Sequence, residues 1–419
     1  MCGWLQPSIP VMKAMRKLLL FSLLSLAFGL VCHAATIVVG VNQDLQSAID
    51  GAASGDVIVL SYPGDYEGHL SITGKSLRFT PAQPGQTSIL GDVSVSNLPT
   101  GGRVAFTNLT LKGNLEVNAS SLHLIKCTVT HPVTVHSKLD ATGNDAKLVV
   151  LQSDLREDLV SKAARSWIGY STLKQTYFEN KVEIVGNIFD GRDEGVIGID
   201  LNGTLTDASI HNNQIYDFSV NGAYPITEKA IGIRVGGGAK ADIRNNLIKN
   251  NRDRNSNSTE HFSALGVYVK STSGTRIVAN LFHNNYVSSG VNDTSSAAVW
   301  ASPQSTVVAY NAMSDSGGKV KGGVSNLDPV YNTDRDEQHF LTNPAGLVSG
   351  TASQDKGLPD PQFNDHDGSR NDIGPNGGRN YLPNGRSTDK PIPIFFSVAP
   401  LAVPVGGVIT IESTGATVK

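Results

Sequence analysis

The clearest pattern in the chain is a short strand motif, small–apolar–x–apolar, that returns four times between residues 198 and 301. A second motif follows each copy after a short gap, with the form apolar–x–x–Asn–x–apolar–x–Asp/Asn. Alternation with a period of two predicts β-strands that bury one side. Two such strands cannot bury their apolar side alone, so successive copies must stack, and the pattern predicts a β-solenoid. The four pairs of motifs are Gly198–Leu201 with Ile210–Asp217, Gly232–Val235 with Ile243–Asn250, Gly266–Val269 with Ile277–Asn284, and Ala298–Ala301 with Val308–Asp315.

An asparagine stands at the same place in every second motif. We expect these residues to form an internal ladder, because a buried amide can donate to one neighbour and accept from another where a turn leaves backbone groups unpaired. The repeat continues upstream at a mean step of roughly 25 residues. At Cys127 a buried small apolar residue is favoured over a reactive thiol. The predicted ladder comprises Asn108, Cys127, Ser153, Ser171, Asn187, Asn213, Asn246, Asn280 and Asn311.

With this ladder and step, the sequence resembles the pectin-lyase-like family of right-handed parallel β-helices, over roughly Thr36 to Gly378. The resemblance implies an all-β fold of about ten or more coils. That fold hosts lyases, hydrolases, epimerases, adhesins and binding proteins, so the resemblance does not fix an activity.

The regions flanking the repeats have distinct compositions. Asp44–Gly51 reads as a short helix with an Asp at its start and a Gly at its end, suited to cover the first coil. We expect the β-helix to occupy residues 35–318. Residues 319–380 resemble the tail of secreted bacterial β-helix proteins and are expected to close the C-terminal end. Residues 381–419 read as a Pro-rich linker with part of an immunoglobulin-like strand region.

Residues 1–34 have the features of a secretory signal peptide. Basic residues at Lys13, Arg16 and Lys17 precede an apolar run, Leu18–Val31, that is too short for a comfortable membrane span. The mature chain is therefore expected to be secreted, or to reach the periplasm or surface of a bacterial cell, with no transmembrane segment. It would keep one cysteine and could form no internal disulfide, so its stability must come from a large core. We expect a monomer.

The x positions of the first motif carry the candidate chemistry. In a β-helix these positions point outward on successive coils about 4.8 Å apart, so they should form one row. Its members are Asp200, Arg234, Tyr268 and Trp300, with Lys270 beside it. Aromatic faces can stack on sugar rings and an Arg can pair with a carboxylate, which predicts an extracellular polysaccharide as the partner. The alternative is an ordinary ion pair between coils beside exposed aromatic residues.

Polysaccharide lyases of the resembling fold remove a proton next to a uronate carboxylate with an Arg or a Lys. The resemblance therefore implies Arg234 as the base, with Lys229 as the alternative and Tyr268, Trp300 and Lys270 as substrate-binding residues. Lyases that depend on calcium surround the base with several acidic groups, whereas this row contains only Asp200. Hydrolysis by Asp200 with Glu228, and a binding module or surface stalk without catalysis, remain open. Polar excursions at 218–229, 251–264 and 285–297 should form a wall beside the row.

Two further sites complete the sequence interpretation. His211 and Arg244 fall in an outward column of the other strand set and are predicted to be a polar pair on the surface. Asp365, Asp367 and Asn371 have the alternate oxygen spacing of calcium loops, and a plain turn stabilised by Asx side chains is the alternative. A net charge of -3 with mixed signs gives no reason to expect nucleic acid as a partner.

Overall fold

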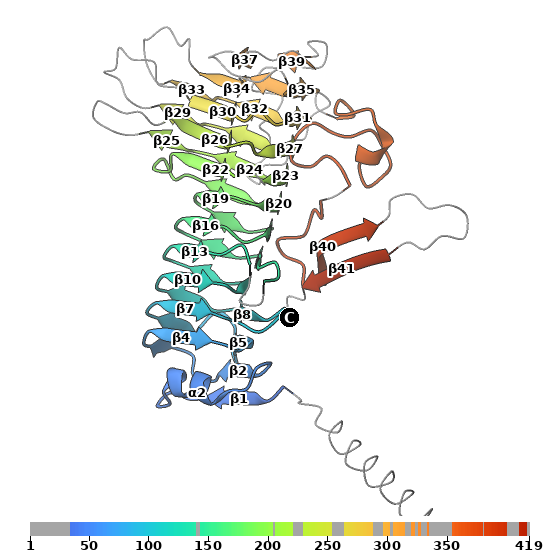
Figure 1. Cartoon of the computed structure of the whole chain (residues 1–419). Helices are drawn as coiled ribbons and strands as arrows, with labels where there is room; N and C mark the ends of the chain where they lie inside the picture. The colour runs from blue at the N-terminus through green and yellow to red at the C-terminus, as the bar shows by residue number, and fades with distance from the viewer. Residues whose placement is uncertain are drawn as a thin grey trace, which may run out of the picture.

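The strands of the chain stack in three long parallel sheets, which form a right-handed parallel β-helix (Figure 1) and confirm the predicted fold. The computed structural model describes residues 34–139, 143–203, 206–220, 229–253, 264–287, 296–301, 305–314, 320–322, 326–327, 333–334, 354–379, 381–399 and 410–416. A coil contributes one strand to each sheet in turn, and we call these sheets C, A and B.

Sheet A contains thirteen strands among the described residues. They are β1 (Thr36–Val39), β2 (Val57–Leu60), β5 (Leu77–Pro81), β8 (Arg103–Thr107), β11 (Ser121–Ile125), β14 (Lys147–Leu151), β17 (Arg165–Gly169), β20 (Lys181–Val185), β23 (Asp207–His211), β27 (Lys240–Arg244), β31 (Arg276–Val278), β35 (Val307–Ala309) and β38 (Asn326–Leu327).

Sheet B follows sheet A in each coil, with twelve strands in the described part of the chain. They are β3 (Asp65–Glu67), β6 (Ser88–Leu90), β9 (Thr110–Lys112), β12 (Thr128–Val129), β15 (Asp154–Leu155), β18 (Thr172–Leu173), β21 (Ile188–Asp190), β24 (Gln214–Tyr216), β28 (Leu247–Lys249), β32 (Leu281–His283), β36 (Ala312–Ser314) and β39 (Thr333–Asp334).

Sheet C carries the predicted outward row and has eleven described strands. They are β4 (Leu70–Thr73), β7 (Val93–Ser96), β10 (Leu115–Asn118), β13 (Val133–Val135), β16 (Leu159–Ser161), β19 (Thr176–Phe178), β22 (Ile197–Leu201), β26 (Ala230–Val235), β30 (Ala264–Val269), β34 (Ala297–Ala301) and β37 (Val320–Gly322).

The register of sheet C is the one that the alternating pattern predicts. The apolar positions of the first motif pair with one another on β22, β26, β30 and β34, and all are fully buried. A slip by one residue would point the charged row toward the core. The free energy needed to bury those charges therefore fixes the register. The buried column comprises Ile199, Ile233, Val267 and Val299.

The Asn ladder forms at the turn from sheet A to sheet B. The Oδ1 of Asn246 accepts from both the backbone N and the Nδ2 of Asn213, each at 3.0 Å. The same contacts repeat up to Asn311, while Ser153, Ser171 and Cys127 continue the column downward with smaller side chains. Cys127 is buried, which raises the pKa of its thiol to about 11, as expected of a structural cysteine.

The ladder position was assigned wrongly at Asn108. Strand pairing aligns Thr107 with Ile125 and Thr110 with Thr128, so Leu109 is the partner of Cys127. Asn108 lies one residue earlier, at φ 56°, in the left-handed conformation that recurs at this turn in the later described coils, up to Tyr310. Asn tolerates that conformation better than most residues, which explains its presence there.

At the N-terminal end, helix α2 (Leu45–Gly51) places Leu45 and Ile49 in the core next to β1 and β4 (Figure 1). Asp44 begins the helix, because its carboxylate accepts a hydrogen bond from the backbone N of Ser47. The last carbonyls of the helix accept three hydrogen bonds from the ammonium of Lys75. The helix end is therefore satisfied by a side chain from the second coil.

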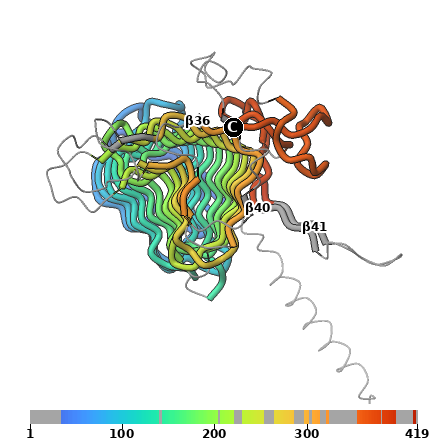
Figure 2. The backbone as a smooth tube through the Cα atoms, turned by 90° about the horizontal axis from the view of Figure 1, so that it is seen from above, coloured from blue at the N-terminus to red at the C-terminus, as the bar shows by residue number. Residues whose placement is uncertain are grey.

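The described part of the C-terminal segment lies along the side of the β-helix, and one of its strands, at residues 410–416, falls in the predicted strand region. Its described residues from 354 onward run back along the outer side of sheet A (Figures 1 and 2). A short 3-10 helix, Pro361–Phe363, is followed by an antiparallel hairpin of β40 (Ile392–Ala399) and β41 (Thr410–Ala416). Ile392 and Ile394 are buried against this face. The part of the predicted cap at 335–353 lies outside the described residues.

The prediction for His211 and Arg244 as a surface pair is wrong. Both side chains are buried, because the C-terminal segment covers them. Asn212 and Asn245, in the left-handed turn positions, donate hydrogen bonds from their amides to backbone carbonyls of residues 372–377. An outward column of the β-helix thus becomes an interior layer.

The long excursions start at equivalent places, as expected. Their first residues pair in a small parallel sheet of β25 (Ser219–Val220), β29 (Arg252–Asp253) and β33 (Tyr286–Val287). The rest of the predicted wall, at 221–228, 254–263 and 288–295, lies outside the described residues, and Glu228 lies with it. Within the described ranges, no helix has the length and apolar composition that a membrane crossing requires.

Candidate functional site

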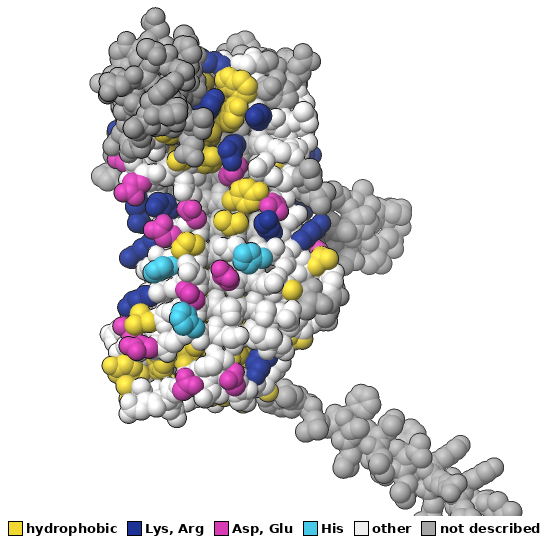
Figure 3. Space-filling model, turned by 60° about the vertical axis from the view of Figure 1, so that its left-hand side comes forward, with side chains coloured by type: hydrophobic (Ala, Val, Ile, Leu, Met, Phe, Trp, Pro, Cys, Tyr) yellow, Lys and Arg dark blue, Asp and Glu magenta, His cyan; other side chains and the backbone are white. Residues whose placement is uncertain are grey.

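The outward row of sheet C is a continuous column on adjacent strands. Asp200 pairs in register with Arg234, Arg234 with Tyr268, and Tyr268 with Trp300. Figure 3 brings this side forward, and basic side chains flank hydrophobic ones in its upper part, while the histidines lie lower. Charged side chains occur along the whole length of this face.

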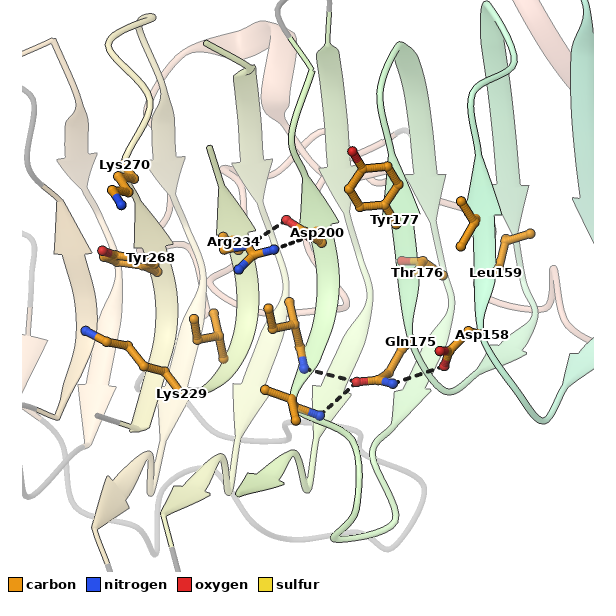
Figure 4. Close-up of a pocket in the computed structure, with 14 residues that line it drawn as sticks. Asp158, Leu159, Gln175, Thr176, Tyr177, Asp200, Lys229, Arg234, Tyr268 and Lys270 are labelled. Atoms are coloured by element: carbon orange, nitrogen blue, oxygen red, sulfur yellow. Dashed lines mark hydrogen bonds and ion pairs between the residues drawn. The ribbon is translucent and has the colours of Figure 1, made fainter. Parts of the chain in front are cut away.

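A groove of about 470 Å³ runs beside this row, and we call it the cationic groove. Lys229, Arg234 and Lys270 line one end around Tyr268, as Figure 4 shows. Asp158, Gln175 and Tyr177 line the other end. The groove crosses β16 to β30, which at about 4.8 Å for each strand is on the order of 19 Å, the scale of several sugar rings.

Asp200 and Arg234 form a bidentate ion pair within this groove. Arg234 Nε donates to Asp200 Oδ1 at 2.7 Å, and Nη2 donates to Oδ2. The Asp200 carboxylate raises the pKa of Arg234, so the guanidinium holds its proton firmly. Asp200 is buried beneath it, unlike the exposed residue that the outward row predicts. This pairing argues against Arg234 as a base and against Asp200 as a free acid.

Lys229 has the electrostatic surroundings of a base. Burial, together with the nearby charge of Lys270, lowers the pKa of its ammonium. Its Nζ lies 5.1 Å from the centre of the Tyr268 ring. Among the described residues neither Lys229 nor Lys270 forms an ion pair with a carboxylate. Within the described structure, these two lysine side chains are therefore available to a ligand in the groove.

The two aromatic residues of the row have different positions. Tyr268 faces the cationic groove, and Trp300 packs on its far side with ring centres 5.0 Å apart at 54°. Trp300 does not line the groove. Tyr268 is thus the ring that can stack on a sugar there, and Trp300 supports it.

Tyr177 was not identified from the sequence, although the signal was present. It occupies the outward position of β19, directly in register with Asp200. Its hydroxyl donates to Glu179 at 3.1 Å, and burial followed by this contact raises its pKa. Gln175 fixes the same end by donating to Asp158 and accepting from the backbone N of Val196.

The groove does not suit a divalent cation. Of the carboxylates that line it, Asp200 has both oxygens engaged by Arg234, and Asp158 accepts from Gln175. Across the described residues no group of three or more His, Cys, Asp or Glu side chains could hold a metal ion.

The predicted calcium turn lies beside sheet A. Asp365 Oδ1 accepts from the backbone N of Gly378, and Asp367 accepts from the backbone N and hydroxyl of Ser369. Asn371 is buried and exchanges side-chain hydrogen bonds with Asn245. These contacts fit the turn alternative, and calcium binding stays a prediction. Adding calcium to protein stripped of metal should raise Tm if a site exists, and an unchanged Tm would leave only the turn.

Comparison with known proteins identifies similar solved structures but no family. No protein-family model matches the chain, and no curated protein matches it. The chain is similar to the crystal structure of pectate lyase Pel9A, with a TM-score of 0.43, 12% identity, and coverage of 82% of this chain and 96% of that one. It is also similar to a mannuronic acid specific polysaccharide family 6 lyase from human gut microbiota, with a TM-score of 0.30, 11% identity, and coverage of 69% and 83%.

Proposed function

We propose that the cationic groove binds an acidic extracellular polysaccharide and cleaves it by β-elimination. The observation that supports this is the arrangement around Tyr268. Lys229 and Lys270 have no carboxylate partner among the described residues, and Lys229 has a lowered pKa. A lysine whose pKa is lowered, beside a fixed positive charge, is the combination that proton removal next to a carboxylate requires.

In the proposed reaction, the uronate carboxylate pairs with Lys270 and with the outer face of Arg234. This pairing stabilises the negative charge that develops when the neighbouring carbon loses its proton. The proton moves to Lys229 in the fraction of molecules in which this lysine is deprotonated, a double bond forms between C4 and C5, and the bond from C4 to the glycosidic oxygen breaks. The expelled oxygen takes a proton from solvent, so one cleavage yields one unsaturated end and one ordinary end.

Tyr268 gives the sugar ring a flat apolar surface between the two lysines. Its ring packs against Trp300, with the Nζ of Lys229 5.1 Å from the ring centre, so it loses little side-chain freedom when a ligand binds. At the other end, the Tyr177 hydroxyl can accept from a sugar hydroxyl, and the second amide N–H of Gln175 can donate to one.

We also propose that the protein is secreted, because the acidic polysaccharide that it would cleave lies outside the cell. Residues 1–33, which carry the signal-like run, lie outside the described part of the structure. Expression of the full chain followed by sequencing of the secreted N-terminus would test cleavage near Ala34.

The function is tested by incubating the protein with pectate, alginate and glycosaminoglycans while recording ultraviolet absorbance and reducing ends. Absorbance from unsaturated products is the expected result. Reducing ends without absorbance would indicate a hydrolase instead. Binding with neither signal would leave a glycan-binding or surface-stalk module, which is the second candidate, because Tyr268 and the unpaired lysines serve binding equally well.

A further inference from the structure

A second groove joins the cationic groove at its basic end. It has a volume of about 700 Å³ and shares Arg234, Tyr268 and Lys270 with the first. The cationic groove runs from these residues across the strands toward Asp158, as Figure 4 shows. The second groove extends past the C-terminal ends of β22, β26 and β30, and we call it the side arm. The open space around Tyr268 is therefore forked.

The side arm has a different chemistry from the cationic groove. Beyond the three shared residues, its lining is neutral and consists of glycine, amide and hydroxyl groups. These residues are Asn202, Gly236, Gly237, Gly238, Ser271 and Thr272. Neutral donors and acceptors of this kind suit uncharged sugar hydroxyls, and they offer no charged partner to a second carboxylate.

The glycine turn keeps the side arm open. Gly237 has φ +61°, and a Cβ there would lie 2.7 Å from Asn202 Oδ1 and 3.0 Å from its backbone carbon. A side chain at Gly237 would collide with the coil below it. The hydroxyl of Ser273 donates to the carbonyl of Gly238 at 2.6 Å, which ties the turn to the next coil. Contacts between consecutive coils therefore hold the side arm in place.

We propose that the side arm binds a neutral sugar branch on the acidic residue held at Arg234 and Lys270. A linear polyuronate would follow the cationic groove and leave the arm empty. A main chain with single neutral branches would fill both, with the branch point beside Tyr268. This inference rests on the proposed function, because the acidic main chain is what the cationic groove would hold.

The test compares linear and branched oligosaccharides of matched main-chain length. One pair is polygalacturonate and xylogalacturonan, and the other is unsulfated chondroitin with and without unsulfated fucose branches. Affinities are measured by calorimetry for the wild type and for Thr272→Trp, which places an indole in the arm from an exposed position. Thr73→Trp, at an exposed position near the other end of sheet C, is the matched control.

We expect the wild type to bind the branched member of one pair about tenfold more tightly than the linear member, and Thr272→Trp alone to remove that preference. Equal affinities for linear and branched chains, unchanged in Thr272→Trp, would overturn the side-arm inference and leave the proposed function intact. If the wild type binds none of the four oligosaccharides, both proposals fail together. A stronger effect of Thr272→Trp on linear chains than on branched ones would also contradict the inference.

Discussion

Sheets A and C are built from the same coils, but their outer faces differ. The C-terminal segment packs on the outer face of sheet A, whereas the outer face of sheet C carries an open groove. On sheet A, Asp242 accepts from Arg276 at 2.9 Å and from Arg244 at 2.7 Å, and Phe363 of the C-terminal segment packs against both guanidinium groups. Burial alone would raise the pKa of Asp242, but the two guanidinium groups hold it below its usual value. On sheet C, Asp200 similarly pairs with Arg234, but Lys229 and Lys270 lie beside the pair without a carboxylate of their own in the described structure.

The difference shows how to separate a structural charge cluster from a candidate site. Both faces contain an Arg–Asp pair between coils, so the pair itself carries no functional information. Lysines without an acidic partner beside an open aromatic ring do indicate a site. Two neighbouring ammonium groups repel each other, so the protein gains no stability from them. Four experiments follow, in order of the size of the expected effect.

The largest effect is expected at Lys229. Replacing it in Lys229→Met should lower kcat on the polysaccharide that the protein cleaves by about 10²–10⁴-fold, as removal of a general base does. Tm should change little, because the side chain is only partly buried. Lys240→Gln, an exposed lysine on sheet A, is the control and should keep full turnover. A normal kcat in Lys229→Met would remove Lys229 from the reaction.

On sheet A the expected effect is on stability. Trp167 is fully covered beneath the hairpin of β40 and β41, close to Tyr170 and Ile394. Trp167→Ala should lower the free energy of unfolding by about 3–5 kcal/mol. Measured on the fraction that remains folded, turnover should equal that of the wild type. If Trp167→Ala instead lost turnover at unchanged stability, the contrast between the two faces would be wrong.

A smaller effect is expected from pH, through Asp372 in the covering segment. Burial raises the pKa of this carboxyl to about 6, assisted by the charges of Asp365 and Asp355. Its folded state then binds a proton more tightly than its unfolded state, so its contribution to stability grows as pH falls from about 7 to 5. Buried His211, whose pKa is lowered, works in the opposite direction over part of this range.

The difference between the wild type and Asp372→Asn isolates this contribution. Chemical denaturation at pH 7 and pH 5 should show the wild type gaining stability relative to Asp372→Asn as pH falls. An equal response of the two proteins would mean that Asp372 titrates normally and that the segment packs less closely than described.

The sequence predicts the repeating parts of this fold well, because repetition amplifies weak signals. The inward column at Ile233 and the outward row at Arg234 follow from alternation alone, and the ladder at Asn246 follows from its period. Asn108 shows the limit, since an Asn suits both the ladder and the left-handed turn before it. Only pairing of the strands separates the two positions.

The covered face of sheet A was less predictable, although part of its signal was visible. Strand β14 reads Lys147–Leu151, with apolar residues at both inward and outward positions, as is typical of a strand buried on both faces. Which segment covers it cannot be read from the pattern, because the covering residues lie more than 200 positions later. The lowered pKa of Lys229 likewise depends first on burial and then on a neighbour, Lys270, and only the stacked coils produce both.

The most direct test of the central claim is the pH dependence of kcat/KM in the wild type and in Lys270→Gln, because kcat/KM reports ionisations of the free enzyme. The wild-type rate should rise with pH as Lys229 loses its proton, with an inflection below the ordinary lysine pKa of 10.5. Removing the charge of Lys270 should move that inflection upward, while Lys270→Arg should leave it in place. An inflection that stays at the wild-type pH in Lys270→Gln would contradict the assignment of Lys229 as the base of the cationic groove.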